Sequence, residues 1–329
     1  LVGSEMCIRD SQTRVLITAI GTMNCTTIIS ELKKAEEVFY VIGADINGKY
    51  SIANSNEVDE FFQFPSVLHD REGYVQYLLN FCKEHNVEVF FCVVDEEVEV
   101  VAKHKEDFNA IGITLCLANI DAIITCHNKN LFAEWSEKNI AKYCIKRYEN
   151  ITDVNNDNFP IFIKPVEGRA SIGCRKIENM EELWKYASVW DNYIAQEYVT
   201  GEIVSVDIVR NRKTEQFEVV QKLELLRNSN GCGIAVEIVD IPEIRQLCCI
   251  IADIFNLNGV INAEFFITNK GLKIIEINPR LPAGIEYSCM AGLDVVLNAL
   301  RIARGEACIF KDIKIGAHYA KRYETYEIK

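Results

Sequence analysis

The sequence is poor in the features that mark several large classes of protein. No apolar stretch approaches the roughly 18–20 residues that a membrane-spanning helix needs, so we expect no membrane span. No run of lysine and arginine forms the basic stripe that nucleic-acid-binding proteins usually carry, and the formal net charge is −13, with 35 basic and 48 acidic residues. We therefore expect neither a nucleic acid nor a membrane as partner. Proline is also scarce, with six residues in 329, which favours compact units.

Paired cysteines are missing as well. The thirteen cysteines include no C-x-x-C pair, and their number is odd, whereas disulfide frameworks and cysteine metal sites show paired spacings. Most lie in apolar, strand-like runs such as Phe90–Val94. Because free cysteine packs as a small hydrophobic residue, the pattern predicts reduced, buried thiols and a cytoplasmic protein.

Short apolar runs alternate with helical stretches along the first third of the chain. We expect strands at 14–20, 38–44, 87–94 and 113–117, and helices at 24–34, 74–84 and 96–107. This alternation predicts a parallel sheet with right-handed crossovers, in a unit that ends near residue 118. Residues 1–11 resemble translated sequencing-adapter sequence, and we expect them to be a non-native extension.

The rest of the chain is mixed. A middle section at 119–190 combines helices with strands at 159–165 and 174–177, and a last section at 191–329 contains five longer β runs. Those runs are expected at 193–199, 203–210, 217–226, 260–268 and 272–278, with helices near 242–256 and 294–304. The predicted fold class is therefore α/β followed by α+β.

The turn after the first strand bears on whether the first unit binds a dinucleotide. The G-x-G-x-x-G fingerprint needs three glycines, whereas the stretch 21–24 supplies one. Asp45 follows the second strand, where a ribose-binding acid would lie. Because the glycines are missing, we interpret Asp45 as a cap of the strand and keep a nicotinamide-dependent enzyme only as a weak alternative.

A lysine at the end of a strand precedes a loop of small residues. Lys164 ends the run 159–165, and the loop 167–173 follows. Backbone N–H groups of such a loop can surround a phosphate, and the ammonium adds positive charge. An ordinary hairpin turn is the alternative, and the chain contains no G-x-x-x-x-G-K-[ST] P-loop.

Acidic and amide side chains gather on two consecutive strands. Glu264 lies on one strand, and Glu276 and Asn278 lie on the next. Side chains two apart in a strand share a face, so a hairpin would bring the three together. Carboxylate and amide oxygens suit Mg²⁺ or Mn²⁺, and the guanidinium of Arg280 beside them suits a transferring phosphoryl group. A solvent-exposed acidic face is the alternative.

The order of these segments resembles the ATP-grasp superfamily, which includes biotin carboxylase, D-alanine–D-alanine ligase and the carbamoyl phosphate synthase large chain. The matching segments are Lys129, the run 163–165 with its loop, Gln196–Glu202, Ala263–Phe265 and Ile275–Arg280. The stretch 278–285 is similar to ATP-grasp proteins of bacterial tellurite-resistance gene neighbourhoods. The resemblance implies a Rossmann-like domain over 12–118 and a two-part ATP-grasp domain, with a small subdomain over 119–190 and a large, metal-binding subdomain over 191–329.

The resemblance also implies roles for particular residues. ATP contacts are expected from Lys129, Lys164, the loop residues Gly168, Arg169, Ala170 and Ser171, and the hinge residues Gln196, Glu197 and Val199. Metal ligands are expected at Glu264, Glu276 and Asn278, while Arg280 and Lys129 would face the reacting groups. The family's ribose-binding acid falls at Ile203 here, so either Glu202 or Asp207 replaces it or no residue does.

Two further stretches are candidates for substrate contacts. Asp95, Glu96 and Glu97 open a helix, where acids favour the helix dipole, or else line a cleft at the strand end. Arg227 and the loop 228–233 are either an ordinary loop or a contact for the acceptor.

By resemblance, the chain is an ATP-dependent ligase. It would activate a carboxylate as an acyl phosphate for attack by an amine or similar nucleophile, with Mg²⁺ or Mn²⁺, on small-molecule substrates and as a homodimer. The alternative is a catalytically silent ATP-binding module with a regulatory role.

Overall fold

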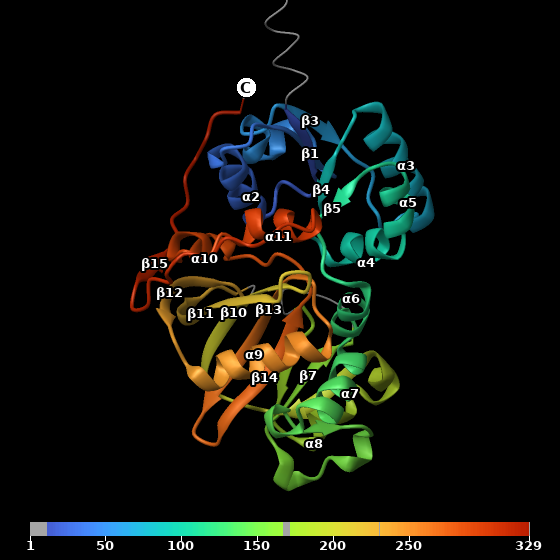
Figure 1. Ribbon diagram of the computed structural model, residues 1–329. Helices are drawn as coiled ribbons and strands as arrows, with labels where there is room; N and C mark the ends of the chain where they lie inside the picture. The colour runs from blue at the N-terminus through green and yellow to red at the C-terminus, as the bar shows by residue number, and fades with distance from the viewer. Residues whose placement is uncertain (1–11, 167–171, 230, 329) are drawn as a thin grey trace, which may run out of the picture.

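Three sheets follow one another along the chain (Figure 1). The computed structural model describes residues 12–166, 172–229 and 231–328, so the expected extension 1–11 lies outside it. Among the described residues, no helix combines the length and the apolar character that crossing a membrane requires.

The first sheet is parallel, as the alternation of strands and helices predicted. Its strand order is β3 (Glu60–Gln63), β2 (Phe39–Asp45), β1 (Thr13–Ile17), β4 (Val89–Phe91) and β5 (Thr114–Leu115). Its helices are α2 (Met23–Lys34), α3 (Arg71–Glu84), α4 (Asp95–Lys103) and α5 (Lys105–Ala110), with short 3₁₀ turns η1 (Lys49–Ser51) and η2 (Ala53–Asn56). One strand was not predicted, and one expected helix is divided. The edge strand β3 was missed, and the helix expected over 96–107 breaks at His104.

The second sheet is a small antiparallel one. Its order is β6 (Arg147–Tyr148), β9 (Tyr193–Glu197), β7 (Ile161–Pro165) and β8 (Arg175–Ile177). Around it lie α6 (Ile120–His127), α7 (Lys129–Asn139), α8 (Met180–Trp184), and the 3₁₀ turns η3 (Ala141–Tyr143), η4 (Ile151–Asp153), η5 (Asn156–Asn158) and η6 (Ala187–Asn192). The sequence placed β9 in the last section, but it pairs with β7 here, so this sheet extends to Glu197.

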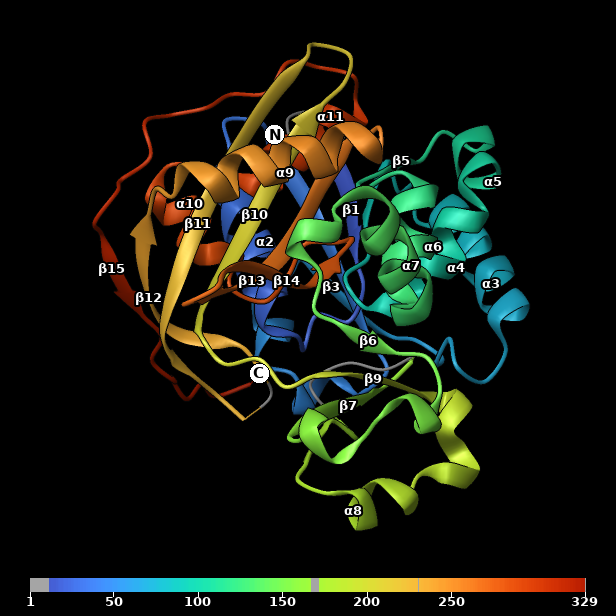
Figure 2. The same cartoon turned by 90° about the horizontal axis from the view of Figure 1, so that it is seen from below.

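The third sheet has six antiparallel strands. Their order is β14 (Gly271–Asn278), β13 (Gly259–Thr268), β10 (Glu202–Asn211), β11 (Gln216–Arg227), β12 (Gly233–Val239) and β15 (His318–Ala320). The helices are α9 (Pro242–Ile254), α10 (Ile285–Ala291) and α11 (Val295–Ala303). Figure 2 shows this sheet with α9 on one face and the small sheet to its side.

The two faces of the six-stranded sheet have different characters. Val204, Val206 and Ile208 of β10 belong to the hydrophobic cluster that includes α9. The intervening side chains point the other way, where the Ser288 hydroxyl of α10 donates to Asp207 at 2.6 Å. Helices α10 and α11 thus separate this face from the first domain (Figure 1).

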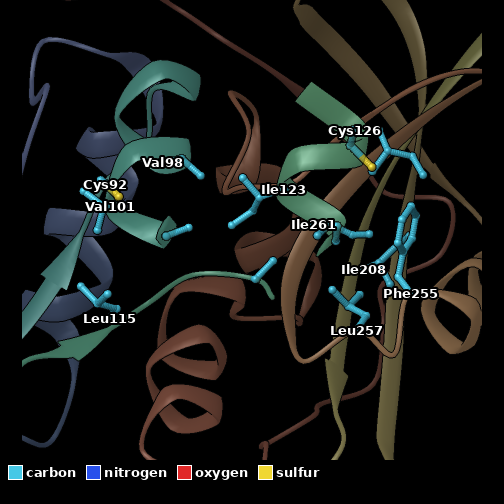
Figure 3. Packing of buried hydrophobic residues seen from close by; sticks show 14 of the residues in the cluster. Cys92, Val98, Val101, Leu115, Ile123, Cys126, Ile208, Phe255, Leu257 and Ile261 are labelled. Atoms are coloured by element: carbon cyan, nitrogen blue, oxygen red, sulfur yellow. The ribbon is translucent and has the colours of Figure 1, made fainter. Parts of the chain in front are cut away.

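Two hydrophobic clusters join the first domain to the six-stranded sheet, and the larger includes α6. Figure 3 shows this larger cluster running from the first domain, through Ile123 and Cys126 of α6, to Ile208 and Ile261 of the sheet. The cysteines take part as predicted, since the twelve in the described residues are free and seven of them are buried. The small sheet has a separate core around Ile161 and Ile163.

Glu97 is a buried acid within the first domain. It accepts hydrogen bonds from the Thr18 hydroxyl at 2.5 Å and from the Tyr74 hydroxyl. Burial raises its pKa from an ordinary value of 4.5 to about 7. Because the folded pKa exceeds the unfolded one, the fold favours the neutral acid. The contribution of neutral Glu97 to the stability of the fold is complete below pH 4.5 and is lost as the pH rises to about 7.

We therefore expect Glu97→Gln to gain stability over the wild type as the pH rises. Between pH 5 and pH 8, the difference in unfolding free energy between the two proteins should grow by roughly 2–3 kcal/mol. Urea unfolding at both pH values measures it, with the exposed Glu106→Gln as control. A difference that stays constant with pH would show that Glu97 is ionised throughout.

Candidate active site

A cavity of about 790 Å³ lies between the three units of the fold. The loops after β1 and β4 line one end, β7 and β9 line another, and the inner face of β10, β11, β13 and β14 forms the floor. The loops are the carboxyl ends of parallel strands, where α/β proteins commonly bind ligands. The volume suits a small-molecule ligand of nucleotide size.

The two glutamates expected to bind a metal meet on the floor of the cavity. Glu264 of β13 pairs directly with Glu276 of β14, and Asn262 pairs with Asn278. All four therefore share one face of the sheet. Burial, and then repulsion from Glu276, raises the pKa of the Glu264 carboxyl above its ordinary value. Within the described chain, no cluster of three His, Cys, Asp or Glu side chains could hold a metal, so a cation here would need the amide oxygens as well.

Arg227, the last residue of β11, reaches these acids. It donates to Glu264 through Nη2 and to the Gly231 carbonyl through Nε at 2.7 Å. Glu224 lies on the other side of the same guanidinium, 2.9 Å from Nε. Mainly because it is buried, the pKa of Glu224 is raised. Of the stretch that the sequence left open as loop or substrate contact, Arg227, Gly231, Cys232 and Gly233 thus line the cavity.

Both expected lysines line the cavity and lie near each other, one on β7 and the other beside the end of that strand. Lys164 of β7 is buried, and its Nζ is 3.5 Å from the Ile275 carbonyl of β14. Burial lowers its pKa, while nearby Glu276 opposes that shift. Lys129 opens α7, and its backbone N–H donates to the Val166 carbonyl at 3.2 Å. The expected phosphate loop, Gly168, Arg169, Ala170 and Ser171, lies outside the described residues.

The expected hinge residues line the cavity, whereas the two candidates for a ribose acid do not. Gln196, Glu197 and Val199 are among the lining residues. Glu202 is exposed at the start of β10 and is not among the described residues that line the cavity. Asp207 is fully buried in an ion pair with Lys222, at 2.6 Å. Asp207 is therefore not available to bind a ribose, because Lys222 neutralises its charge and α10 covers it.

Arg280 joins the floor of the cavity to the first domain. Its Nε and Nη2 donate to the two carboxylate oxygens of Asp95 at 2.6 and 2.9 Å. Next to it, the Asn24 side chain donates to the Leu281 carbonyl at 2.8 Å. Asp95 therefore opens α4 and lines the cavity at the same time, so both interpretations of this acidic stretch hold for it.

Asp45 caps the end of β2, as the sequence indicated. Its carboxylate accepts from the backbone N–H of Gly21 at 2.9 Å and of Asn47 at 2.9 Å. A Cβ added at Gly21 would lie 2.8 Å from the end of the Ile52 side chain and 3.1 Å from Asp45, so a larger residue there would displace both side chains. The carboxylate of Asp45 therefore holds the first turn in place while residues 21–24 line the cavity.

Two functional candidates were missed. Asn262 stands two residues before Glu264 and holds its orientation through Ser205 at 2.9 Å and Asp207 at 2.8 Å. The signal in the sequence was that Asn262 and Glu264 are two residues apart, so they share a face of the strand. Glu224 was not singled out, because a regular β11 would turn it away from Arg227.

Comparison with known proteins agrees with this architecture. Residues 190–321 match the family described as ATP-grasp in the biosynthetic pathway with Ter operon. Residues 15–116 match the family described as PylC-like, N-terminal domain. Among solved structures, the biotin carboxylase domain of Hydrogenobacter thermophilus 2-oxoglutarate carboxylase is similar, with a TM-score of 0.73 and 16% identity over 93% of this chain and 73% of that one. An L-amino acid ligase from Bacillus licheniformis is also similar, with a TM-score of 0.67 and 12% identity over 90% of this chain and 74% of that one.

Curated relatives match part of the chain. The 3-methyl-D-ornithine–L-lysine ligase of Methanosarcina barkeri is 27% identical over 171 residues, which are 48% of this chain and 46% of that protein. The ligase of the same name from Methanosarcina mazei is 30% identical over 125 residues, 38% of this chain and 32% of that protein. The match thus spans less than half the length of these relatives.

The fold and these matches place the chain among the ATP-grasp proteins. More narrowly, residues 190–321 match the ATP-grasp family associated with the Ter operon, and residues 15–116 match a PylC-like N-terminal domain. This confirms the resemblance found in the sequence.

Proposed function

We propose that this ligase activates a substrate carboxylate with Mg-ATP and joins it to an amine. The observation that carries the proposal is the register of β13 and β14, which sets Glu264 directly opposite Glu276 on the floor of the cavity. Lys164, Lys129 and Arg280 line the same cavity and supply positive charge for phosphates. Oxygen ligands and cations meeting in one cavity are the parts that phosphoryl transfer requires.

The residues present fit a divalent cation. Two carboxylates in direct register repel each other, and this repulsion contributes to the raised pKa of Glu264. A cation held by Glu264, Glu276 and Asn278 would offset the repulsion with the hard oxygen ligands that Mg²⁺ or Mn²⁺ prefers. Arg227 partly plays that role in the structure by pairing with Glu264.

The nucleotide would lie between the two antiparallel sheets. We assign its phosphates to Lys129 and Lys164 and its base to Gln196, Glu197 and Val199, all of which line the cavity. ATP supplies the phosphoryl group: a carboxylate oxygen bonds to the γ-phosphorus as ADP leaves, and an amine then displaces phosphate from the acyl carbon.

The substrates would enter at the end of the cavity lined by the first domain. That end is formed by residues 21–24, the stretch 93–95 and Arg280. Arg280 is held there by Asp95, so its remaining N–H groups can bind a carboxylate or phosphoryl oxygen without reorienting. Relatives named as ligases of two amino acids support an amine as the nucleophile.

A homodimer is part of the proposal. The biotin carboxylase domain of Hydrogenobacter thermophilus is described as a dimer, and size-exclusion chromatography with light scattering would give the state of this chain.

ADP release across a panel of carboxylates and amines tests the function. Wild-type protein with Mg-ATP should release ADP with at least one pair, and hydroxylamine should trap the activated carboxylate as a hydroxamate. If Mg-ATP binds tightly in calorimetry but no pair causes ADP release, the alternative of a catalytically silent nucleotide-binding module would replace the ligase proposal.

A further inference from the structure

A second acidic position lies in the cavity, apart from the pair Glu264 and Glu276. The Glu224 side chain is 5% exposed and lines the cavity beside Arg227. Nothing in the proposed activation of the carboxylate uses it. A buried carboxylate is costly unless donors satisfy its oxygens, so its hydrogen bonds indicate what it is for.

One oxygen of Glu224 lacks a donor. The Gly233 backbone donates one hydrogen bond to the carboxylate. Oε2 lies 2.9 Å from Arg227 Nε, but Nε carries a single hydrogen, which it donates to the Gly231 carbonyl. Among the described residues, Oε2 therefore accepts no hydrogen bond. The ion pair provides charge on one side and leaves the acceptor open.

The backbone is built to aim this carboxylate at the cavity. Residues three apart in a regular strand face opposite sides, yet Glu224 and Arg227 both line the cavity. The pairing of β11 with β12 is irregular between Glu224 and Leu226, which inserts Leu225 and turns the strand by one residue. Leu225 and Leu226 are 53% and 57% exposed. The bulge thus leaves two leucines in contact with solvent and points Glu224 into the cavity.

The facing strand leaves room for the carboxylate. A Cβ added at Gly233 of β12 would lie 3.0 Å from both Cδ and Oε1 of Glu224. Any other residue at position 233 would crowd the group. An irregular strand, a glycine opposite it and an open acceptor oxygen thus coincide at one residue.

We infer that Glu224 binds an ammonium group of a substrate, so that at least one of the two molecules joined is an amino acid or a similar cationic amine. The inference deepens the proposed ligase function and rests on it for the identity of the cavity. An ammonium carries three donors and a positive charge, which matches the open carboxylate oxygen of Glu224, and the neighbouring Arg227 guanidinium would bind the acid end of the same molecule.

The test compares substrates that differ only in an ammonium group. The probes are L-alanine against propionate, L-glutamate against glutarate, and L-lysine against both 6-aminohexanoate and L-norleucine. ADP release is measured for each with wild type, Glu224→Gln and the control Glu237→Gln, which removes a charge from β12 outside the lining residues described. Thermal stabilisation by each probe, without nucleotide, gives a second reading that needs no turnover.

We expect wild type to prefer one aminated probe over its analogue. Glu224→Gln should reduce that preference roughly 10–100-fold, the range expected for a hydrogen bond to a charged group, mainly through KM for the probe and with little change in KM for ATP. Gly233→Ala keeps the charge but crowds it, and should reduce the same preference. The control Glu237→Gln should match wild type.

The outcomes separate the two proposals. ADP release with an unchanged preference in both Glu224→Gln and Gly233→Ala overturns the role of Glu224 and leaves the ligase intact. Ammonium-dependent stabilisation that disappears in Glu224→Gln, without ADP release by any protein, supports the ammonium site and contradicts the ligase. Wild-type protein that neither turns over nor is stabilised by an aminated probe overturns both.

Discussion

Glu276→Gln is expected to slow ADP release by about a hundred- to ten-thousandfold. Metal ions contribute several kcal/mol to charge stabilisation in such transfers, and each 1.36 kcal/mol corresponds to about a tenfold change in rate. The substitution removes one of the two charges that face each other across β13 and β14. Steady-state ADP release at varied Mg²⁺ measures the loss, which should be greater in kcat than in KM for the acceptor.

The same substitution should not unfold the protein. Because Glu276 raises the pKa of Glu264 by repulsion, a neutral amide at position 276 relieves that repulsion, and the melting temperature without metal should stay level or rise. Glu181→Gln, on the exposed face of α8, serves as the charge-matched control with unchanged activity. Turnover of Glu276→Gln at the wild-type rate would falsify the metal assignment.

Lys222→Met is expected to cause a large loss of stability, about 3–5 kcal/mol. The ammonium of Lys222 lies 2.6 Å from Asp207, and the two side chains are 2% and 0% exposed. Removing the lysine leaves a buried carboxylate without its charge partner. Hydrogen bonds from Ser288 and Asn262 remain, so we expect a value near the lower end of the range.

Urea unfolding at neutral pH measures this loss, and the chain offers a matched exposed pair. Lys142 and Glu243 lie 2.9 Å apart with 75% and 45% of their side chains exposed. Lys142→Met should change stability by less than about 0.5 kcal/mol. Equal effects of the two lysine substitutions would mean that burial does not govern the cost at Lys222. Adding Asp207→Leu to Lys222→Met should recover part of the loss.

Strand periodicity predicted most of the sheets, and its failures have physical reasons. The run 14–20 is apolar because β1 is buried on both faces of a parallel sheet. β3 has four residues and lies at an edge with no fully buried side chain, so it leaves almost no apolar signal. β12 alternates from Ile234 to Ile238, but only Val236 and Ile238 are buried, so its apolar signal is short.

The candidate site was predictable where it depends on local pairing. Glu264 and Glu276 are twelve positions apart on strands joined by a short turn, and the hairpin alone sets them face to face. Asp207 stayed open as a candidate for the ribose because periodicity gives the face of a residue and not its depth under α10. The ion pair of Arg280 with Asp95 joins residues 185 apart, a distance over which no local pattern carries information.

The attachment of the first domain has a consequence for ligand exchange. Two bonds, from Arg280 to Asp95 and from Asn24 to Leu281, fasten it to one turn of the large sheet, and a shared core lies behind them (Figure 3). The four-stranded sheet is packed around its own core instead. We therefore expect the nucleotide to enter and leave when the small sheet rotates as a rigid body and moves Lys164 away from Ile275. The first domain and the six-stranded sheet would keep their positions.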